Sequence, residues 1–264
     1  MVPSWTETLV RCGLPVVGRT RFCIHPAPKN IPVVGGTKDW SLAKLAKLNP
    51  DLVILDREEN PKFMAIEAPC EVFATHVTSV GTVALELERL ALRLNPLSGS
   101  AELHRIATRW RAVRDIARTT RQLSFGRDFP GVSEWLHPPS GNVMDPRHHQ
   151  LVYVIWKDPW MCAGRGTFIA SMLEILGWPT ERLWAGGAIS RSAQRAETKY
   201  PMFELQELPK SAIVFFSTEP FPFHKRKDEL RGWVSRPCAI VDGESFSWFG
   251  IRSLEFLERA FVVP

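Results

Sequence analysis

The chain has 264 residues, of which 45% are hydrophobic and 23% are charged, the composition of an ordinary globular protein. No run approaches the roughly 18 apolar residues of a membrane span, which excludes a typical transmembrane helix. The net charge of +5 admits an anionic partner. Basic and acidic residues alternate along the expected helices, however, so we expect no nucleic-acid partner.

The amino-terminal residues and the cysteines bear on the compartment. Residues 1–13 show no basic stretch followed by an apolar one, so no secretory signal is visible. The five cysteines lack CxxC spacing, and an odd number without a signal favours free thiols in a reducing compartment. The sequence therefore predicts a cytoplasmic protein. A periplasmic location is the alternative if the natural amino terminus lies upstream.

Residues 1–95 are predicted to form an amino-terminal α/β lobe, because short apolar runs alternate with amphipathic helices. The expected strands are at residues 16–18, 33–34, 52–55 and 71–77, and the last expected helix is at 80–94.

The loop at residues 19–26 is dense in reactive side chains. Cys23 and His25 suggest a nucleophile and base, or half a metal site, but no second cysteine or histidine lies nearby in the sequence. Ligand binding is the favoured alternative, with Phe22 as a stacking surface and Arg19 as an anion contact.

One stretch, residues 41–60, recurs more loosely at residues 202–220. Each copy has two leucines three residues apart, then a proline, then an apolar run that turns polar abruptly. The leucines predict a short helix that the proline ends, and the run is typical of a strand buried on both faces of a parallel sheet. Ligands bind beyond the carboxyl ends of such strands, so the repeat predicts two similar lobes with polar strand ends.

Residues 96–123 are predicted to form a linking backbone helix, and residues 124–150, rich in proline, an irregular insertion. Residues 151–264 are predicted to form a carboxy-terminal α/β lobe. The apolar stripe of the linking helix consists of Leu103, Ile106, Trp110, Val113 and Ala117.

Aromatic and charged residues mark the strand ends of the second lobe. Lys157, Trp160 and Arg165 lie between a strand and the start of a helix, a place suited to an anionic or planar ligand, although packing explains Trp160 equally well. Glu219 and Trp248 follow the next two strands. Aromatic rings beside carboxylates suit a bulky, partly apolar ligand with a polar rim.

Several motifs together resemble one family. Residues 3–7 match a Pro-x-x-Thr-Glu opening, and residues 42–60 match a Leu-x-x-(Ile/Leu)-x-x-Leu-x-Pro-Asp-Leu-Val-Ile run. Pro159, Gly164, Gly177 and the Trp248–Phe249 pair continue the pattern. Across nearly the whole chain, residues 124–150 apart, this order resembles the bacterial solute-binding proteins with a helical backbone. These are the cobalamin, haem and ferric-siderophore receptors of ABC import systems, and the likeness is closest to the cobalamin receptors.

The resemblance implies an α/β protein with two Rossmann-like lobes of largely parallel sheets, joined by a single long helix, with a ligand cleft between them. It implies a monomeric, non-enzymatic binder of a corrinoid or metal chelate (cobalamin, haem or a ferric siderophore-like ligand), serving ABC-type uptake, with no covalent cofactor and no protein-bound metal. The ligand contacts that it implies are Trp5, Arg19, Phe22, Lys38, Glu58, Lys157, Trp160, Arg165, Glu219 and Trp248.

Three positions depart from the family pattern. Asp56 stands where the cobalamin receptor presents an aromatic ring. The acidic residues that dock such receptors onto a permease are not evident, since Gly250 stands near one of them and Lys62 or Phe63 near the other.

An intracellular binder, sensor or enzyme on the same fold is the alternative function. It would use Cys23, His25 and Asp242, and it requires these three side chains to converge within hydrogen-bond reach.

Overall fold

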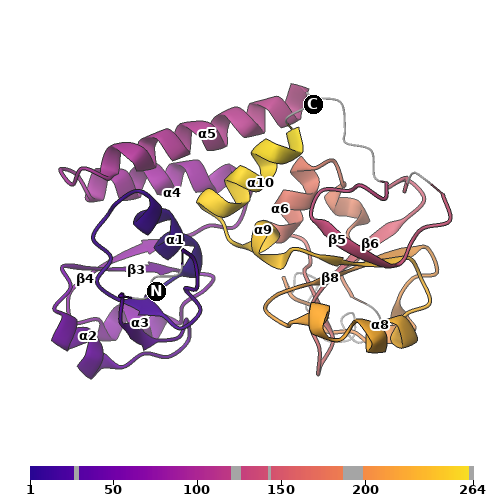
Figure 1. Ribbon diagram of the computed structural model, residues 1–264, viewed down its shortest axis with the longest axis horizontal. Coiled ribbons are helices and arrows are strands. Elements are labelled where there is room, and N and C mark those ends of the chain that lie inside the picture. The colour runs from indigo at the N-terminus through magenta and orange to yellow at the C-terminus, as the bar shows by residue number, and fades with distance from the viewer. Residues whose placement is uncertain (27–29, 120–125, 142–143, 187–198, 262–264) are drawn as a thin grey trace. The chain divides into compact units, whose positions relative to one another are not determined.

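The computed structural model describes residues 1–26, 30–119, 126–141, 144–186 and 199–261 (Figure 1). The chain forms two compact units. Unit 1 consists of Met1–Asp115 and Trp248–Arg259, and unit 2 of Ile116–Ser247 and Ala260–Pro264. Within the described ranges, no helix is long and apolar enough to cross a membrane.

Unit 1 contains two parallel strand pairs, β1 with β2 and β3 with β4. Helices α2 and α3 cover one face of the β3–β4 pair, where Val53 and Leu55 pack with Leu45 and Met64 (Figure 1). The elements are α1 (Pro3–Arg11), β1 (Arg19–Thr20), β2 (Val33–Gly35), α2 (Leu42–Leu48), β3 (Leu52–Asp56), α3 (Lys62–Glu67), β4 (Glu71–Thr75) and α4 (Val80–Arg93).

Helices α5 (Ser100–Thr119) and α10 (Ile251–Phe261) complete unit 1. The predicted stripe of α5 is buried at Leu103, Ile106, Trp110 and Val113. The indole N–H of Trp110 donates to the carbonyl of Gly250, just before α10, at 3.1 Å. These contacts anchor the carboxy-terminal helix in the unit formed by the amino-terminal half.

The predicted lobe boundaries therefore need correction. Most of α5 belongs to unit 1 instead of forming a separate linker at residues 96–123, and unit 1 extends past residue 95. The second lobe was predicted at residues 151–264. In the structure, Trp248–Arg259 belong to unit 1, and unit 2 begins at Ile116. The reason is that the apolar stripes of α5 and α10 are buried within unit 1, a pairing between distant segments that sequence periodicity does not reveal.

Unit 2 is built on a five-stranded sheet in the order β5-β9-β8-β6-β7. The central strands β9, β8 and β6 are parallel, and the two edge strands run antiparallel to their neighbours. The elements are β5 (Val132–His137), β6 (Gln150–Trp156), β7 (Met161–Cys162), α6 (Phe168–Ile175), β8 (Ala212–Ser217), α8 (Lys227–Trp233), β9 (Cys238–Val241) and α9 (Gly243–Ser247), with 3-10 turns at Thr180–Arg182, Leu205–Glu207 and Phe223–Lys225.

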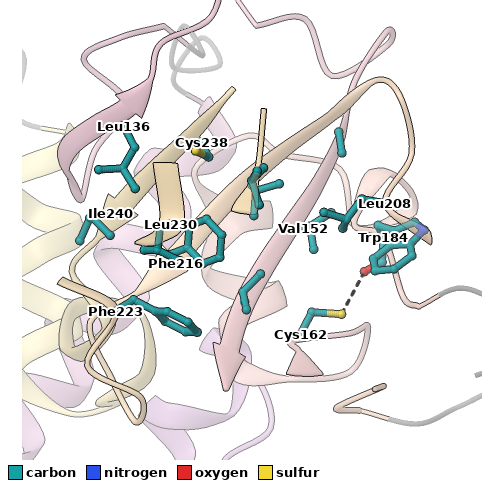
Figure 2. Close-up of a cluster of buried hydrophobic side chains, with 14 of the residues drawn as sticks. Leu136, Val152, Cys162, Trp184, Leu208, Phe216, Phe223, Leu230, Cys238 and Ile240 are labelled. Atoms are coloured by element: carbon teal, nitrogen blue, oxygen red, sulfur yellow. Dashed lines mark hydrogen bonds between the residues drawn. The ribbon is translucent and has the colours of Figure 1, made fainter. Parts of the chain in front are cut away.

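Both faces of this sheet are buried, which explains the continuous apolar runs of its central strands. On one face Val152, Phe216 and Ile240 pack with Leu230 of α8 (Figure 2). On the other face the ring of Tyr153 lies 5.5 Å from that of Phe246 in α9.

The segment at 124–150 is not wholly irregular, contrary to the prediction. It contains β5, which pairs with β9 along the sheet edge. Its Leu136 joins the core, and Glu134 forms ion pairs with Lys227 and Arg231. The prolines of this segment flank the strand and do not interrupt it, as expected at the edge of a sheet.

The predicted repeat is confirmed for the proline and the buried strand of each copy, but its helix is present only in the first copy. In unit 1, α2 is followed by Pro50 and β3, and in unit 2, the turn Leu205–Glu207 is followed by Pro209 and β8. The second copy keeps only one 3-10 turn in place of the predicted helix, with Leu208 buried beneath it.

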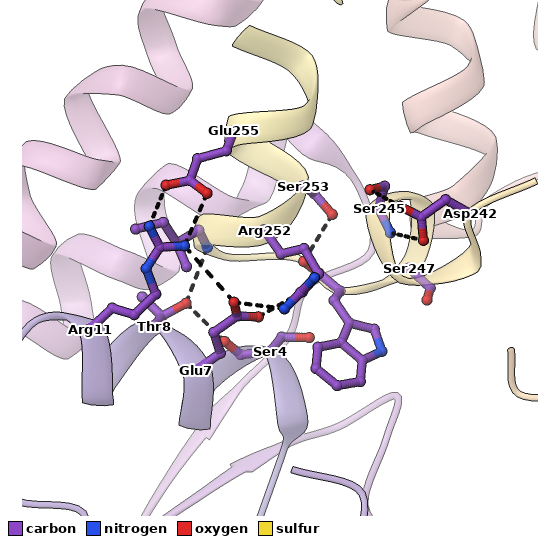
Figure 3. Close-up of polar contacts among 12 residues, drawn as sticks. Ser4, Glu7, Thr8, Arg11, Asp242, Ser245, Ser247, Arg252, Ser253 and Glu255 are labelled. Carbon is purple, nitrogen blue, oxygen red and sulfur yellow. Dashed lines mark hydrogen bonds and ion pairs between the residues drawn. The ribbon is translucent and has the colours of Figure 1, made fainter. Parts of the chain in front are cut away.

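A buried carboxylate joins the two ends of the chain within unit 1. Glu7 of α1 accepts two hydrogen bonds from the guanidinium of Arg252 in α10, at 2.8 and 2.9 Å (Figure 3). Beside it, Arg11 pairs with the more exposed Glu255. The Thr8 hydroxyl also accepts from the backbone N–H of Ile251 at 3.1 Å, which fixes the start of α10.

We expect Glu7→Ala to destabilise the protein much more than Glu255→Ala. The first substitution removes the carboxylate that pairs with the mostly buried Arg252, and we expect it to lower the free energy of unfolding by about 2–3 kcal/mol. The more exposed pair of Arg11 with Glu255 contributes only about 0–1 kcal/mol to the same free energy. Urea unfolding of the two variants checks this. Equal losses would show that Arg252 reaches solvent when Glu7 is removed.

Candidate functional site

The carboxyl ends of β3 and β4 are held together by the buried carboxylate of Asp56. Its Oδ2 accepts from the Thr75 hydroxyl at 2.6 Å and from the Val77 N–H at 3.0 Å. Its Oδ1 accepts from the Glu58 N–H at 2.9 Å. Asp56 therefore fixes the first residues of both loops that leave these strands.

Burial raises the pKa of Asp56, opposed by the hydrogen bonds from Thr75, Glu58 and Val77 and by the nearby His76. Since Asp56 is fully buried, it supplies no surface to a ligand. At this position, where the resemblance led us to expect an aromatic ring, the chain has a buried carboxylate that holds two loops together.

The loops after β2 and β3 also contact each other. Asn60 donates its amide to the carbonyls of Thr37, at 2.8 Å, and Met1, at 3.3 Å. The Lys38 ammonium donates to the carbonyl of Glu59. The strand ends of the two pairs therefore form one continuous surface in unit 1.

Three predicted contacts in unit 1 are engaged within the protein. Trp5 is 1% exposed, and its indole N–H donates to the Thr75 hydroxyl at 2.9 Å. The guanidinium of Arg19 donates to three backbone carbonyls, those of Ile31, Thr20 and Cys23. Trp248 is 5% exposed and lies beneath Arg252 and beside the His25 ring. Their side chains hold the strand-end loops in place, and their contact with a ligand stays a prediction.

The other three predicted residues of unit 1 remain accessible. Phe22 is 49% exposed, with the Arg21 guanidinium 5.1 Å from its ring centre. Lys38 is exposed, and Glu58 is half-buried and bonded to His76 at 2.9 Å. His76 was missed by the sequence analysis. Its place one residue beyond the end of β4 is the signal that could have found it.

Cys23 and Asp242, which the alternative enzyme would use, each have hydrogen-bond partners of their own. Cys23 is fully buried, and its sulfur lies 3.1–3.2 Å from the hydroxyls of Thr20 and Thr6. In unit 2, Asp242 accepts a hydrogen bond from the Ser245 hydroxyl at 2.6 Å (Figure 3). A cysteine nucleophile needs a base on its sulfur, and here both neighbours of the sulfur are threonine hydroxyls.

In unit 2, the loop after β6 places a lysine over aromatic rings. The Lys157 ammonium lies 5.0 Å from the ring centre of Trp233 and 5.8 Å from that of Trp160. It also pairs with Asp158 at 2.7 Å, and Asp158 has a left-handed backbone (φ 65°) that is unusual for a non-glycine residue. Local backbone strain of this kind is frequent at ligand sites.

Trp160 serves mainly as a packing residue. Its ring is stacked parallel to that of Phe223, with centres 6.0 Å apart, and contacts Phe203, Phe216 and Trp233. It is half-buried, so one part of the ring remains at the surface. This supports both alternatives that the sequence left open.

The sequence analysis missed much of this aromatic surface. Trp156 is 39% exposed at the end of β6, and its ring meets that of Phe221 edge-on at 5.6 Å. Arg226 lies 5.5 Å from the Trp233 ring and 6.0 Å from the Phe221 ring. We call Trp156, Lys157, Trp160, Phe221, Arg226 and Trp233 the aromatic–cation surface.

Glu219 and Arg165 have different surroundings. Glu219 follows β8, and its carboxylate accepts from Ser247 of α9 at 3.2 Å. Gly243 fits tightly here, since a Cβ would lie 2.3 Å from the Ser217 hydroxyl. The Arg165 guanidinium instead donates to the carbonyls of Thr180 and Glu181 in a 3-10 turn. Glu219 thus stays at the strand ends, and Arg165 holds a different loop.

The described ranges contain no group of three or more histidine, cysteine, aspartate or glutamate side chains that could hold a metal ion. In both units, ring and charged side chains lie at the strand-end loops.

We expect Asp56→Ala to lower the free energy of unfolding by about 3 kcal/mol, because it removes the acceptor of three hydrogen bonds, from Thr75, Val77 and Glu58. Asp56→Asn should cost less, and the exposed Asp51→Asn should cost under about 0.5 kcal/mol. Hydrogen exchange should quicken at residues 57–60 and 76–79. An unchanged exchange pattern would contradict the role given to Asp56.

Asp56 should also influence how the free energy of unfolding depends on pH. Burial raises the pKa of Asp56 above its unfolded value, so the native state retains this proton to higher pH. Its contribution to stability is then full below the unfolded pKa and is lost as pH rises through the folded pKa. In the Asp56→Asn variant this loss of stability with rising pH should be absent, which urea unfolding measured at several acidic pH values checks.

Comparison with known proteins gives matches in structure but not in sequence. No protein-family model matches the chain, and no curated protein matches it by sequence. The periplasmic vitamin B12 binding protein BtuF of Vibrio cholerae is 15% identical, with a TM-score of 0.63 over 99% of this chain and 93% of its own. The periplasmic heme-binding protein RhuT of Roseiflexus sp. RS-1 is 16% identical, with a TM-score of 0.61 over 98% and 95%. A periplasmic heme-binding protein of Pseudomonas aeruginosa is 16% identical, with a TM-score of 0.64 over 98% and 88%.

These proteins are described as periplasmic, which contradicts the cytoplasmic location predicted from the sequence. Free cysteines suggested a reducing compartment, but four of the five are buried and so do not indicate the compartment. Burial raises the pKa of Cys12 and Cys238 to about 11 and that of Cys162 to about 12, which keeps these thiols unreactive in any compartment.

The suspected resemblance is confirmed as a likeness of fold. Each of these alignments covers 98% or 99% of this chain. The chain has the two-lobed α/β fold of the cobalamin- and heme-binding solute-binding proteins.

Proposed function

We propose that this protein is a solute-binding protein for a corrinoid or metal chelate of the cobalamin, haem or ferric-siderophore type, acting outside the cytoplasm in ABC-type uptake. The observation that carries this proposal is the aromatic–cation surface of unit 2. The structural neighbours support it, since they are described as vitamin B12 and heme-binding proteins.

The aromatic–cation surface suits a flat ligand with anionic groups at its edge. Trp156 and Trp233 offer partly exposed rings, and aromatic side chains give a planar ligand a large apolar contact area. Lys157 and Arg226 lie against these rings. Each already pairs with one carboxylate, Asp158 or Glu229, which keeps it oriented and limits the cost of its partial burial.

Unit 1 supplies a second strand-end surface of different character. Phe22 offers one exposed ring, and Lys38, Glu58 and His76 offer polar groups. Because Asp56 orders the loops that carry Glu58 and His76, this surface is largely preformed. A preformed surface loses little conformational entropy when the ligand binds.

Docking onto a permease would have to differ from the family pattern. At Gly250 an added Cβ would lie 2.4 Å from the Thr8 hydroxyl and 3.1 Å from the carbonyl of Ser4. The backbone there also has a φ of 117°. An acidic side chain therefore has no room at this position, and any acidic docking residue would lie elsewhere on the chain.

Titration of the purified protein with haem, cobalamin and ferric siderophores tests the proposal. We expect a spectral change and a rise in melting temperature with one of the three classes. No response to any of them would overturn the proposed ligand chemistry.

We further expect Lys157→Ala to weaken binding of the responding ligand about tenfold, the loss of one charge-assisted contact. Lys210→Ala is the matched control. Lys210 is an exposed lysine of the same unit that lies before the amino end of β8, at the opposite edge of the parallel strands. Isothermal titration checks both variants. Equal effects would show that Lys157 acts only through the overall charge of the protein.

A further inference from the structure

His76 presents an exposed imidazole at the strand-end surface of unit 1. The residue lies one position beyond the carboxyl end of β4, and 47% of its side chain is exposed. The neutral imidazole is the commonest metal ligand among protein side chains, and it is also a frequent ligand of haem iron. The chemistry of His76 therefore suits a direct contact to the metal of a chelate.

The carboxylate of Glu58 decides which nitrogen of the His76 ring is available. Its Oε1 lies 2.9 Å from Nε2 of the imidazole. An ionised carboxylate only accepts hydrogen bonds, so this contact favours the neutral tautomer that carries its proton on Nε2. Nδ1 then holds an unshared electron pair. A histidine with a carboxylate on one nitrogen and a metal on the other is the usual arrangement in protein metal sites, because the carboxylate fixes the ring and raises its basicity.

The backbone that carries this pair is held from several sides. The N–H of His76 donates to Oε1 of Glu86 at 3.3 Å, and Glu86 is only 6% exposed. The next N–H, that of Val77, donates to the buried carboxylate of Asp56 at 3.0 Å, and Glu58 donates its own N–H to the same carboxylate at 2.9 Å. Asp56 thus fixes His76 and Glu58 relative to each other, which is the support that a metal ligand needs.

Other side chains that commonly bind haem iron are placed differently. Tyr153 is fully buried in unit 2, its hydroxyl donates to Ser217 at 3.4 Å, and burial raises its pKa. Its oxygen therefore neither reaches a ligand nor ionises. His224 is exposed in the turn Phe223–Lys225, but among the described residues it has no carboxylate partner to orient its ring. His76 combines exposure at a strand end with a carboxylate that positions the ring.

A single histidine is sufficient for a chelate and insufficient for a bare ion. The part of the chain that is described has no group of three ligating side chains, which a bare metal ion would need. A macrocyclic chelate brings its own equatorial donors and leaves only axial positions to the protein.

We propose that His76 coordinates the metal of the bound chelate through Nδ1, and that Glu58 is the positioning residue that orients its ring. The electron pair of the imidazole replaces an axial water of the metal, and the water leaves as a neutral molecule without any change of oxidation state. This inference rests on the proposed function and narrows its ligand class. The metal must have an exchangeable axial position, as in ferric haem or aquocobalamin. A ferric siderophore whose own oxygens fill all six positions has none.

Absorption spectra of the full chain with ferric haem and with aquocobalamin test the proposal. We expect the unsubstituted protein to give the spectrum of an imidazole-ligated metal with at least one of the two. In His76→Ala the affinity should fall by about tenfold or more, and the spectrum should be that of the water-ligated metal. Free imidazole added to this variant should restore the imidazole-ligated spectrum.

Two further variants separate the roles of the residues. Glu58→Gln removes the carboxylate and keeps the size of the side chain. It should weaken binding about tenfold, while the complex that still forms keeps the imidazole-ligated spectrum. His224→Ala is the matched control, because it removes an exposed histidine that has no orienting carboxylate among the described residues. It should leave both the affinity and the spectrum unchanged.

The outcomes distinguish this inference from the proposed function. The same spectrum for His76→Ala as for the unsubstituted protein would overturn the role of His76, and so would equal losses of affinity in His76→Ala and His224→Ala. Binding of ferric siderophores alone would overturn the inference and leave the proposed function intact. Binding of none of the three ligand classes would overturn both.

Discussion

The carboxylate of Asp56 is the interaction on which the strand-end surface of unit 1 depends. It is fully buried at the end of β3, and it accepts hydrogen bonds from Thr75 in β4, from Val77 beyond β4 and from Glu58 in its own loop. A buried carboxylate is costly unless each oxygen is bonded, and here both are. The loops that carry Glu58 and His76 consequently leave their strands in one fixed arrangement.

Unit 2 reaches an ordered strand-end surface by a different route. Aromatic packing replaces the buried carboxylate: Trp160 stacks on Phe223 and meets Trp233 edge-on, so that rings position the loops after β6 and β8. Cations lie against these rings at Lys157 and Arg226. One unit therefore presents mainly polar groups and the other mainly rings with positive charge.

Much of the secondary structure could be predicted because the local signals are strong. The expected strand at residues 52–55 and the expected helix at residues 80–94 agree with β3 and α4 to within one residue, and the repeat predicted β3 and β8 from a proline followed by a buried run. The site was less predictable. Trp5 and Arg19 had the right chemistry and the right position, but their polar groups are taken by Thr75 and by backbone carbonyls. A sequence shows which groups are available and not which of them find partners inside.

Local sequence patterns were enough to specify the two α/β units, their parallel strands and the polar residues at the strand ends, because periodicity, prolines and apolar runs act over short stretches. Which segments share a unit became clear only in the folded chain, since α10 is anchored to α1 through Glu7 and Arg252, some 245 residues apart. The fold also shows that the carboxylate of Asp56 is buried and bonded within unit 1, and that Trp233 lies against Lys157 in unit 2. These features depend on long-range contacts and burial, which no short stretch of sequence specifies.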